Sequence, residues 1–164
     1  VTVNAGHIPK DHWTQDPKIG GGRIIGEACH YIDLIRFFVG KKIIKVTSEN
    51  AEESGSVIKD RSTISLKFED GSLGTILYLS NGAPNYPKER VEIFSEGKIL
   101  QLDNFKKMKG FGWKNFKKMN LFQQDKGQSA CTLEFIKGLE AGIPTIASEE
   151  IFDIAEATIL AGES

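Results

Sequence analysis

The sequence predicts an α+β fold, with an open, mainly antiparallel sheet and helices packed on one face. Two hairpins in which apolar and polar residues alternate indicate the sheet, and helical periodicity occurs only before and after this block of strands. Strands that follow one another without helices between them favour α+β over an alternating α/β arrangement. With 164 residues, 40% of them hydrophobic, the chain can form a substantial core, and we assign residues 1–164 to a single domain.

The first helix is predicted after a glycine triplet, Gly20–Gly22. Helical spacing of apolar residues indicates one buried stripe, and Gly40 is typical of the position just beyond a helix C-terminus. We therefore expect this helix to end near Val39. Its stripe consists of Ala28, Ile32, Ile35 and Val39.

The strands are bounded by residues that favour turns. Asp70-Gly71 joins the clearer hairpin, and Ser95–Gly97 joins the second. The lysine-rich residues 105–119 have no regular period, so they predict a loop or an irregular sheet edge. The predicted strands are 43–48, 63–68, 73–79, 91–94 and 98–102, with loops at 49–55 and 81–87.

Two further helices are predicted towards the C-terminus. The first covers residues 127–141 and is closed by Gly142 and Pro144. The second has Ser148 as its N-cap and acidic residues in its first turn, where they interact favourably with the helix dipole. Its expected buried face contains Ile151, Ile154, Ala155, Thr158 and Ile159.

Glu27, His30 and Asp33 are spaced three apart on the first helix, so their side chains are expected on one side of it. The carboxylates would orient the imidazole of His30 and raise its pKa, which makes His30 a candidate proton carrier. The alternative is a histidine that only packs. Arg23 suits a bidentate contact to a phosphate or carboxylate, or is a solvated surface residue. Gly20–Gly22 either form a flexible loop or let the backbone approach a ligand.

The glycine triplet, the helix start and the His30-x-x-Asp33 pattern resemble the second domain of the glucose-fructose oxidoreductase / inositol dehydrogenase (GFO/IDH/MocA) family. The resemblance covers nearly the whole chain. The chain is also similar to a bacterial subgroup in which this unit follows other oxidoreductase domains, often associated with cell-surface polysaccharide synthesis. The other stretches that carry it are Asn4–Gly6, Asp11–Trp13, Asp70–Thr75, Pro87–Glu92 and Gln124–Gly127.

The resemblance implies a substrate-binding and dimerisation domain of a NAD(P)-dependent oxidoreductase that acts on a sugar, a sugar nucleotide or a polyol by hydride transfer. It implies that His30 is catalytic and, with a lysine of the nucleotide-binding domain, handles the proton of the hydroxyl being oxidised. Arg23, Glu27 and Asp33 are then expected to bind the substrate. Many family members have Asp or Asn where this chain has Gly26, and Glu27 is the neighbour that would compensate.

The resemblance also implies a two-fold dimer through the open face of the sheet, in the hairpin region of Ile64, Leu66, Phe68 and Leu73–Leu79. No Gly-x-Gly-x-x-Gly fingerprint is present, so no residue here is expected to bind the cofactor. The chain opens on Val1 and reads as an excised piece. NAD(P) is therefore expected to be bound mainly by a nucleotide-binding domain absent from it, which would leave this fragment inactive alone.

Composition limits the partners. A net charge of −1 gives no general attraction to nucleic acid or to an anionic membrane, and no apolar run is long enough to span a bilayer. We expect a cytoplasmic protein with a small-molecule substrate, no membrane partner and no nucleic acid. Cys29 and Cys131 fit reduced thiols. A metal site built from His7, His12, Cys29 and His30 is disfavoured by their spacing.

The alternative function is a non-enzymatic binding module, with RNA as the candidate ligand of residues 105–119. Lys109–Phe116 resembles the aromatic octapeptide of RNA-recognition motifs, and 77–81 mimics the companion hexapeptide. Pro84 and Pro87 stand where that fold needs a helix, and Lys114 replaces a buried aliphatic residue. The sequence therefore favours a solvated lysine-rich loop.

Overall fold

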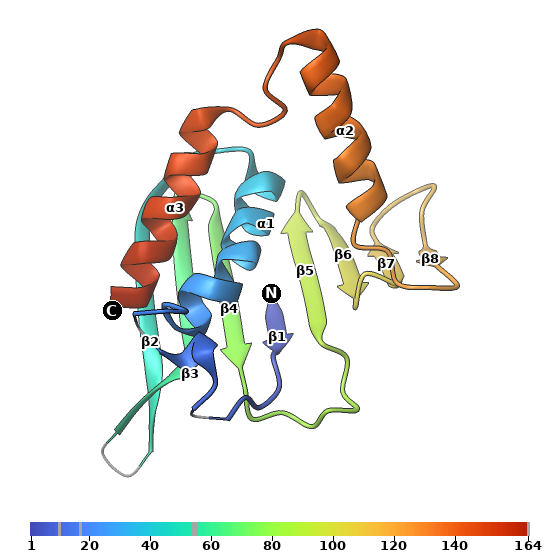
Figure 1. The fold of residues 1–164 in the computed structure, drawn as a ribbon. Helices are drawn as coiled ribbons and strands as arrows, with labels where there is room; N and C mark the ends of the chain where they lie inside the picture. The colour runs from blue at the N-terminus through green and yellow to red at the C-terminus, as the bar shows by residue number, and fades with distance from the viewer. Residues whose placement is uncertain (10, 17, 54–55, 164) are drawn as a thin grey trace. The chain divides into compact units, whose positions relative to one another are not determined.

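The computed structural model describes residues 1–9, 11–16, 18–53 and 56–163 (Figure 1). They form two compact units, Val1–Lys88 with Phe152–Ser164 and Glu89–Ile151. Strands outnumber α-helices in both units, and all strand pairs but one are antiparallel among the paired strands described. The α+β class is therefore confirmed.

The first unit contains four strands in the order β2-β3-β4-β1. Strands β2, β3 and β4 are antiparallel neighbours, and the short β1 runs parallel to β4. Two helices, α1 and α3, cover one face of these strands (Figure 1). The bounds are β1 Thr2–Asn4, α1 Cys29–Val39, β2 Ile43–Glu53, β3 Ser56–Phe68, β4 Leu73–Leu79 and α3 Ser148–Glu163.

The core of this unit lies between the helices and the strands. Alternate residues of β4 point inwards, so Ile76 and Tyr78 are buried while Leu77 and Leu79 remain exposed. This is the alternation expected of an antiparallel sheet covered on one face. The buried cluster also includes Ile32 and Ile35 of α1, Ile64, Leu66 and Phe68 of β3, and Ala157 and Ala161 of α3.

The helix α3 is present where it was expected, and its predicted buried face is confirmed for Thr158 and in part for Ile154, but not for Ile151, Ala155 and Ile159. Ile151 and Ile159 are about half exposed, whereas Asp153, Ala157, Thr158 and Ala161 are buried. Asp153 determines this rotation because its Oδ2 accepts hydrogen bonds from Arg36 Nε at 2.9 Å and from the Ile43 backbone N–H at 3.1 Å. Small side chains then face the strands.

The second unit is a four-stranded antiparallel meander, β5-β6-β7-β8, followed by α2. The bounds are β5 Glu89–Ser95, β6 Lys98–Asp103, β7 Lys107–Phe111, β8 Lys118–Asn120 and α2 Gln128–Ala141. Of the two alternatives for 105–119, the structure shows the irregular sheet edge: residues 107–111 and 118–119 belong to the short strands β7 and β8, and the rest of the tract is irregular. Lysine is common on short edge strands, and it masked the alternation.

The predicted exit turn at 49–55 is also wrong for residues 49–53, which extend β2. Residues 54 and 55 lie outside the described part of the chain. The remaining predicted strands, the helix before Gly40 and the helix before Gly142 are confirmed. Among the described residues, no helix is both long and apolar enough to cross a membrane.

Candidate functional site

The glycine triplet forms a tight connection to the helix that carries His30. Gly21 and Gly22 have φ values of 70° and 82°, a region that side-chain-bearing residues rarely adopt. A Cβ atom on Gly20 would lie 2.5 Å from Thr14 Cα. The close approach that Gly20 permits is therefore to the chain's own backbone.

A π-helical turn, Ile24–Ala28, precedes α1. Such turns are rare and often occur at functional sites. His30 lies in the first turn of α1, and its side chain is exposed. Tyr31, Ile32 and Ile35 of the same helix are buried. Packing thus fixes the helix while leaving His30, and the exposed Asp33 one turn later, on the accessible side.

Arg23 is buried, so its interpretation as a solvated surface residue is wrong. It is only 4% exposed, and its guanidinium donates from Nη1 to the Gly6 carbonyl at 2.6 Å and from Nη2 to the Ala5 carbonyl at 3.0 Å. Nη2 also reaches Glu27 Oε2 at 2.9 Å, and the group stacks on the Tyr78 ring. Arg23 therefore ties the loop after β1 to the π-helical turn.

Glu27 accepts hydrogen bonds at both carboxylate oxygens. Oε2 receives Arg23 and the Tyr78 hydroxyl, and Oε1 receives Lys88 Nζ at 2.6 Å. Burial alone would raise the pKa of Glu27, but the hydrogen bonds from Lys88, Tyr78 and Arg23 outweigh it and lower the pKa to about 2. Glu27 is therefore a permanent anion near neutral pH.

This network was not predicted, and it changes the part assigned to Glu27. None of the hydrogen bonds in the described part of the chain joins Glu27 to His30, so the expected orientation of the imidazole by Glu27 is not found. Instead, Glu27 connects the start of the helix to β4 through Tyr78 and to the residue before β5 through Lys88. We name Arg23, Glu27, Tyr78 and Lys88 the Glu27 cluster.

The sequence held only partial signals for the two missing members. Tyr78 falls on the inward positions of the β4 alternation, which predicted burial but gave no partner. Lys88 lies in the Pro87–Glu92 stretch that carried the family resemblance. Their partner Glu27 is 51 and 61 residues away along the chain, a separation that no local pattern reports.

Replacing Tyr78 with phenylalanine tests the cluster without changing the shape of the core. Burial and the hydrogen bond to Glu27 raise the pKa of Tyr78, so it is a neutral donor. The variant removes this donor from a half-buried carboxylate, so its free energy of unfolding should be lower by about 1–3 kcal/mol. Urea unfolding measures the difference. A variant as stable as the wild type would mean that the hydroxyl contributes nothing there.

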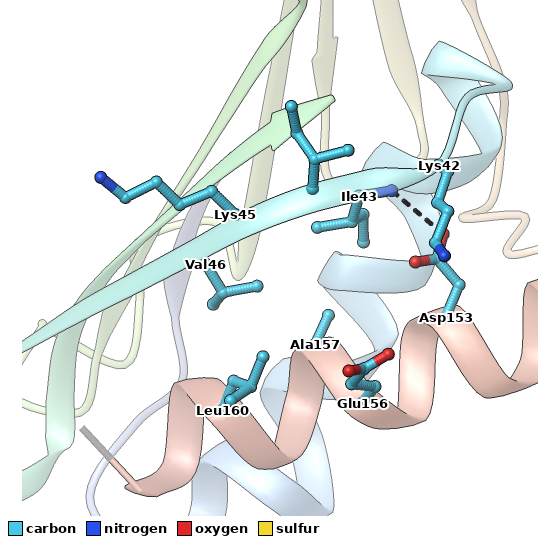
Figure 2. Close-up of a pocket in the computed structure, with 9 residues that line it drawn as sticks. Lys42, Ile43, Lys45, Val46, Asp153, Glu156, Ala157 and Leu160 are labelled. Carbon is cyan, nitrogen blue, oxygen red and sulfur yellow. Dashed lines mark hydrogen bonds between the residues drawn. The ribbon is translucent and has the colours of Figure 1, made fainter. Parts of the chain in front are cut away.

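A separate hollow of about 360 Å³ lies in the first unit between the start of β2 and α3. Figure 2 shows Val46, Ala157 and Leu160 around it, with Asp153 bonded to the Ile43 N–H. It is lined by none of the residues that the sequence singled out for catalysis. We therefore attribute it to the packing of α3 on β2.

The histidines do not form a metal centre in the described residues, where no group of three or more His, Cys, Asp or Glu side chains could hold a metal ion. His12 has a local structural contact instead. Its Nδ1 lies 2.9 Å from Thr14 Oγ1, at the start of the short 3₁₀ helix Trp13–Gln15. Burial raises the pKa of the Cys29 thiol, which favours its neutral form.

The strand pairing argues against the RNA-recognition arrangement. That motif needs its two aromatic peptides on neighbouring strands. Here Leu77–Leu79 lie on β4, which pairs with β3 and β1, whereas Lys109–Phe111 lie on β7, which pairs with β6 and β8. The two peptides are therefore not neighbours in any pairing of the described strands.

Comparison with solved structures supports the fold. UDP-N-acetylglucosamine 3-dehydrogenase GnnA from Acidithiobacillus ferrooxidans is 14% identical, with a TM-score of 0.74 over 99% of this chain and 51% of that one. Biliverdin reductase from Synechocystis sp. PCC 6803, in complex with biliverdin and NADP+, is 14% identical, with a TM-score of 0.73 over 99% and 52%. GenD2 from gentamicin A biosynthesis, in complex with NAD, is 18% identical, with a TM-score of 0.66 over 99% and 50%.

The chain thus spans about half the length of these structures. No curated protein sequence matches it significantly. The model of the GFO/IDH/MocA C-terminal domain matches residues 2–100, which include the glycine triplet, His30 and the whole Glu27 cluster. The resemblance seen in the sequence is confirmed, and the chain belongs to the GFO/IDH/MocA C-terminal domain family.

Proposed function

We propose that this chain is the substrate-binding domain of a NAD(P)-dependent oxidoreductase that acts on a sugar, a sugar nucleotide or a polyol. The observation that carries the proposal is the exposed His30 on a helix whose opposite side is buried, in a member of this family. In this proposal His30 accepts the proton from the substrate hydroxyl during oxidation and returns it during reduction. The nicotinamide supplies the hydride acceptor.

Asp33 is proposed to contact the substrate, because it is exposed one helical turn from His30. Substrate contact by Arg23 and Glu27 stays a prediction. Arg23 donates hydrogen bonds to the carbonyls of Ala5 and Gly6 and to Glu27. These bonds favour a structural role, in which the Glu27 cluster holds the start of the helix in place. A carboxylate held by several donors is also a rigid anchor for the neighbouring turn.

The residues of this chain do not fit a dinucleotide site. The glycine triplet leads into the helix from an irregular loop rather than from a strand, and the spacing of a dinucleotide fingerprint is absent. We therefore propose that the cofactor is held by the part of the enzyme that corresponds to the other half of its structural relatives.

The chain alone is accordingly expected not to bind NADH or NADPH. Isothermal titration of each dinucleotide into the purified chain measures this directly. Heats no larger than those of dilution are expected. Saturable binding at physiological concentrations of either dinucleotide would place a cofactor site within these residues. It would contradict the proposal that another part of the enzyme holds the cofactor.

We also propose a two-fold dimer through the hairpin region of β3 and β4. The side chains named for it from sequence need revision, because Ile64, Leu66 and Phe68 are buried beneath the helices. The exposed face of β4 carries Leu73, Leu77 and Leu79. An exposed apolar strand face of this kind favours a self-complementary contact.

Replacing Leu77 with lysine tests this dimer. Leu77 is 39% exposed in the middle of β4, where a charge would be desolvated by a facing copy. Sedimentation at tens of micromolar should reveal dimers of the wild type. The variant should have a dimer dissociation constant raised by more than about tenfold. Phe37→Lys, at an exposed apolar position on α1, is the matched control. A monomeric wild type would contradict the proposed dimer.

The state of the two cysteines bears on the cellular compartment of the protein. Cys29 and Cys131 are both free thiols in the structure. Two unpaired cysteines suit a reducing compartment, so we propose a cytoplasmic enzyme with a small-molecule substrate.

A further inference from the structure

The Glu27 cluster contains one positive charge more than its carboxylate balances. Arg23 and Lys88 are cations that share the single anion Glu27. The Tyr78 hydroxyl is neutral, because burial and its hydrogen bond to Glu27 raise its pKa. The pKa of Glu27 is lowered to about 2, so its carboxylate contributes one negative charge throughout the neutral range. Arg23 and Glu27 alone would form a neutral pair, and Lys88 supplies the charge in excess.

The two cations differ in their access to solvent. The side chain of Arg23 is 3% exposed, whereas that of Lys88 is 44% exposed. Lys88 Nζ donates to Glu27 Oε1 at 2.6 Å, and an ammonium group has three hydrogens to donate. Lys88 can therefore hold Glu27 and donate to a ligand at the same time.

The connection between β4 and β5, which carries Lys88, is exposed but fixed to β1. The backbone N–H of Asn4 donates to the Lys88 carbonyl at 2.7 Å. Asn4 Nδ2 donates to the carbonyls of Ala83 at 2.8 Å and Tyr86 at 3.3 Å. A lysine held at its backbone and at its ammonium group gives up much rotamer freedom. Residues fixed in this way on exposed loops are typical of binding sites.

Glu27 brings the ammonium group of Lys88 close to His30. Glu27 and His30 are three residues apart on a helical surface, where side chains at this spacing are neighbours. The His30 side chain is exposed, and so is the end of the cluster at Lys88. A sugar ring whose hydroxyl contacts His30 can therefore place a second substituent against Lys88.

Gly26 leaves space on the same side of the helix. It is exposed and precedes His30 by four positions, so the two share one side of the helix. Gly26 is not among the glycines with positive φ in the described residues. A Cβ atom there would approach only the Gly20 carbonyl oxygen, at an ordinary 3.6 Å. Glycine is less favourable than alanine in a helix, and neither conformation nor packing requires it here. A ligand lying against this turn would require it.

We propose that Lys88 binds an anionic group of the substrate, which makes the substrate an acidic sugar. This inference rests on the proposed function, because it takes His30 as the residue that contacts the hydroxyl being oxidised. The anionic group is a carboxylate, as in a sugar acid, or a phosphate, as in a sugar phosphate or a sugar nucleotide. Both accept charge-assisted hydrogen bonds from an ammonium group. The sugar ring then lies over Gly26, between His30 and Lys88.

Binding of matched sugars to the full-length enzyme tests this inference. The enzyme is saturated with NADH or NADPH, so that the sugars bind without being oxidised. Calorimetry then measures dissociation constants for D-glucose, D-galactose, D-glucuronate, D-galacturonate and α-D-glucose 1-phosphate. At least one acidic probe should bind more than about tenfold more tightly than the neutral sugar of the same configuration. A preference for a uronate identifies a carboxylate, and a preference for glucose 1-phosphate identifies a phosphate.

Three variants locate this preference in the structure. Lys88→Gln should abolish it, whereas Lys88→Arg keeps the charge and should retain it. Gly26→Leu should weaken the binding of acidic and neutral sugars alike, because its side chain would occupy the position of the ring. The matched control is Lys41→Gln, at an exposed lysine beyond the other end of α1, and it should bind every probe like the wild type.

Circular dichroism and unchanged affinity for the dinucleotide check that each variant is folded. The proposal is overturned if no acidic probe binds more tightly than its neutral counterpart, or if the preference persists in Lys88→Gln. It is also overturned if Gly26→Leu binds every probe like the wild type. Oxidation of neutral sugars with hydride transfer and no effect of Lys88→Gln would remove this inference and leave the proposed function standing. Binding of an acidic sugar that depends on Lys88, without hydride transfer, would retain the anion site and remove the proposed function.

Discussion

Replacing His30 with alanine in the full-length enzyme should lower kcat by about 10²- to 10⁴-fold, the usual contribution of a positioned acid–base side chain. The imidazole is exposed in the first turn of α1, where Tyr31, Ile32 and Ile35 anchor the helix from its other side. Cofactor affinity should not change, because the cofactor is proposed to bind elsewhere. Steady-state kinetics with saturating NAD(P)+ measures kcat directly.

The control for this variant is His7→Ala, which removes an exposed histidine from the loop that precedes the helix. It should leave kcat unchanged. Asp33→Asn should have a smaller effect than His30→Ala, because it removes a charge near the imidazole rather than the proton carrier. Near-normal turnover of His30→Ala across neutral pH would make this histidine a packing residue and would remove the catalytic assignment.

Replacing Glu27 with glutamine should produce the largest loss of stability among polar substitutions in the first unit. The carboxylate is 23% exposed and is held by Arg23, Tyr78 and Lys88. Its pKa falls from 4.5 to about 2, which, discounted for the solvent exposure of the group, corresponds to about 1–3 kcal/mol of folding free energy near neutral pH. The substitution also leaves the charge of Arg23 buried without its counterion.

The sign of the pH dependence follows from the lowered pKa. The contribution of Glu27 is fully present above pH 4.5 and is lost as the pH falls towards about 2, where the folded state also takes up the proton. The difference in unfolding free energy between the wild type and Glu27→Gln should therefore shrink over this interval. Urea unfolding at a series of pH values measures it.

Glu156→Gln is the matched control, because Glu156 is exposed on α3 in the same unit. It should change the unfolding free energy by less than about 0.5 kcal/mol at every pH. If Glu27→Gln behaves like this control, the hydrogen bonds of the Glu27 cluster contribute no net stability.

The sequence predicted the helices and strands that are determined by neighbouring residues along the chain. Periodicity located α1, and alternation with Asp70-Gly71 located the β3–β4 hairpin. It gave β7 and β8 only as a loop or an irregular sheet edge because Lys107 and Lys109 hide a short alternation, and it predicted the buried face of α3 only in part. That face depends on the contact of Asp153 with Arg36, which lies 117 residues away. Hydrophobicity alone favoured the exposed isoleucines.

The residues of the candidate site also fall into those that a local sequence pattern identifies and those that only the fold brings together. His30 was found because a motif surrounds it, and its exposure is consistent with the proposed catalytic role. Glu27 was found as a neighbour of His30, but its partners Tyr78 and Lys88 come from distant parts of the chain. A carboxylate three residues from a histidine can turn towards it or away from it, and only the fold decides which.

The central claim, that this domain serves a hydride-transferring enzyme of sugars or polyols, is tested most directly by isotope transfer. The full-length enzyme would be incubated with NAD(P)+ and sugars, sugar nucleotides or polyols deuterated at the hydroxyl-bearing carbons, and the nicotinamide product analysed by mass spectrometry. The account predicts deuterium on the reduced nicotinamide with wild-type enzyme and strongly slowed transfer with His30→Ala. Reduced cofactor without deuterium, or transfer at the wild-type rate in His30→Ala, would contradict it.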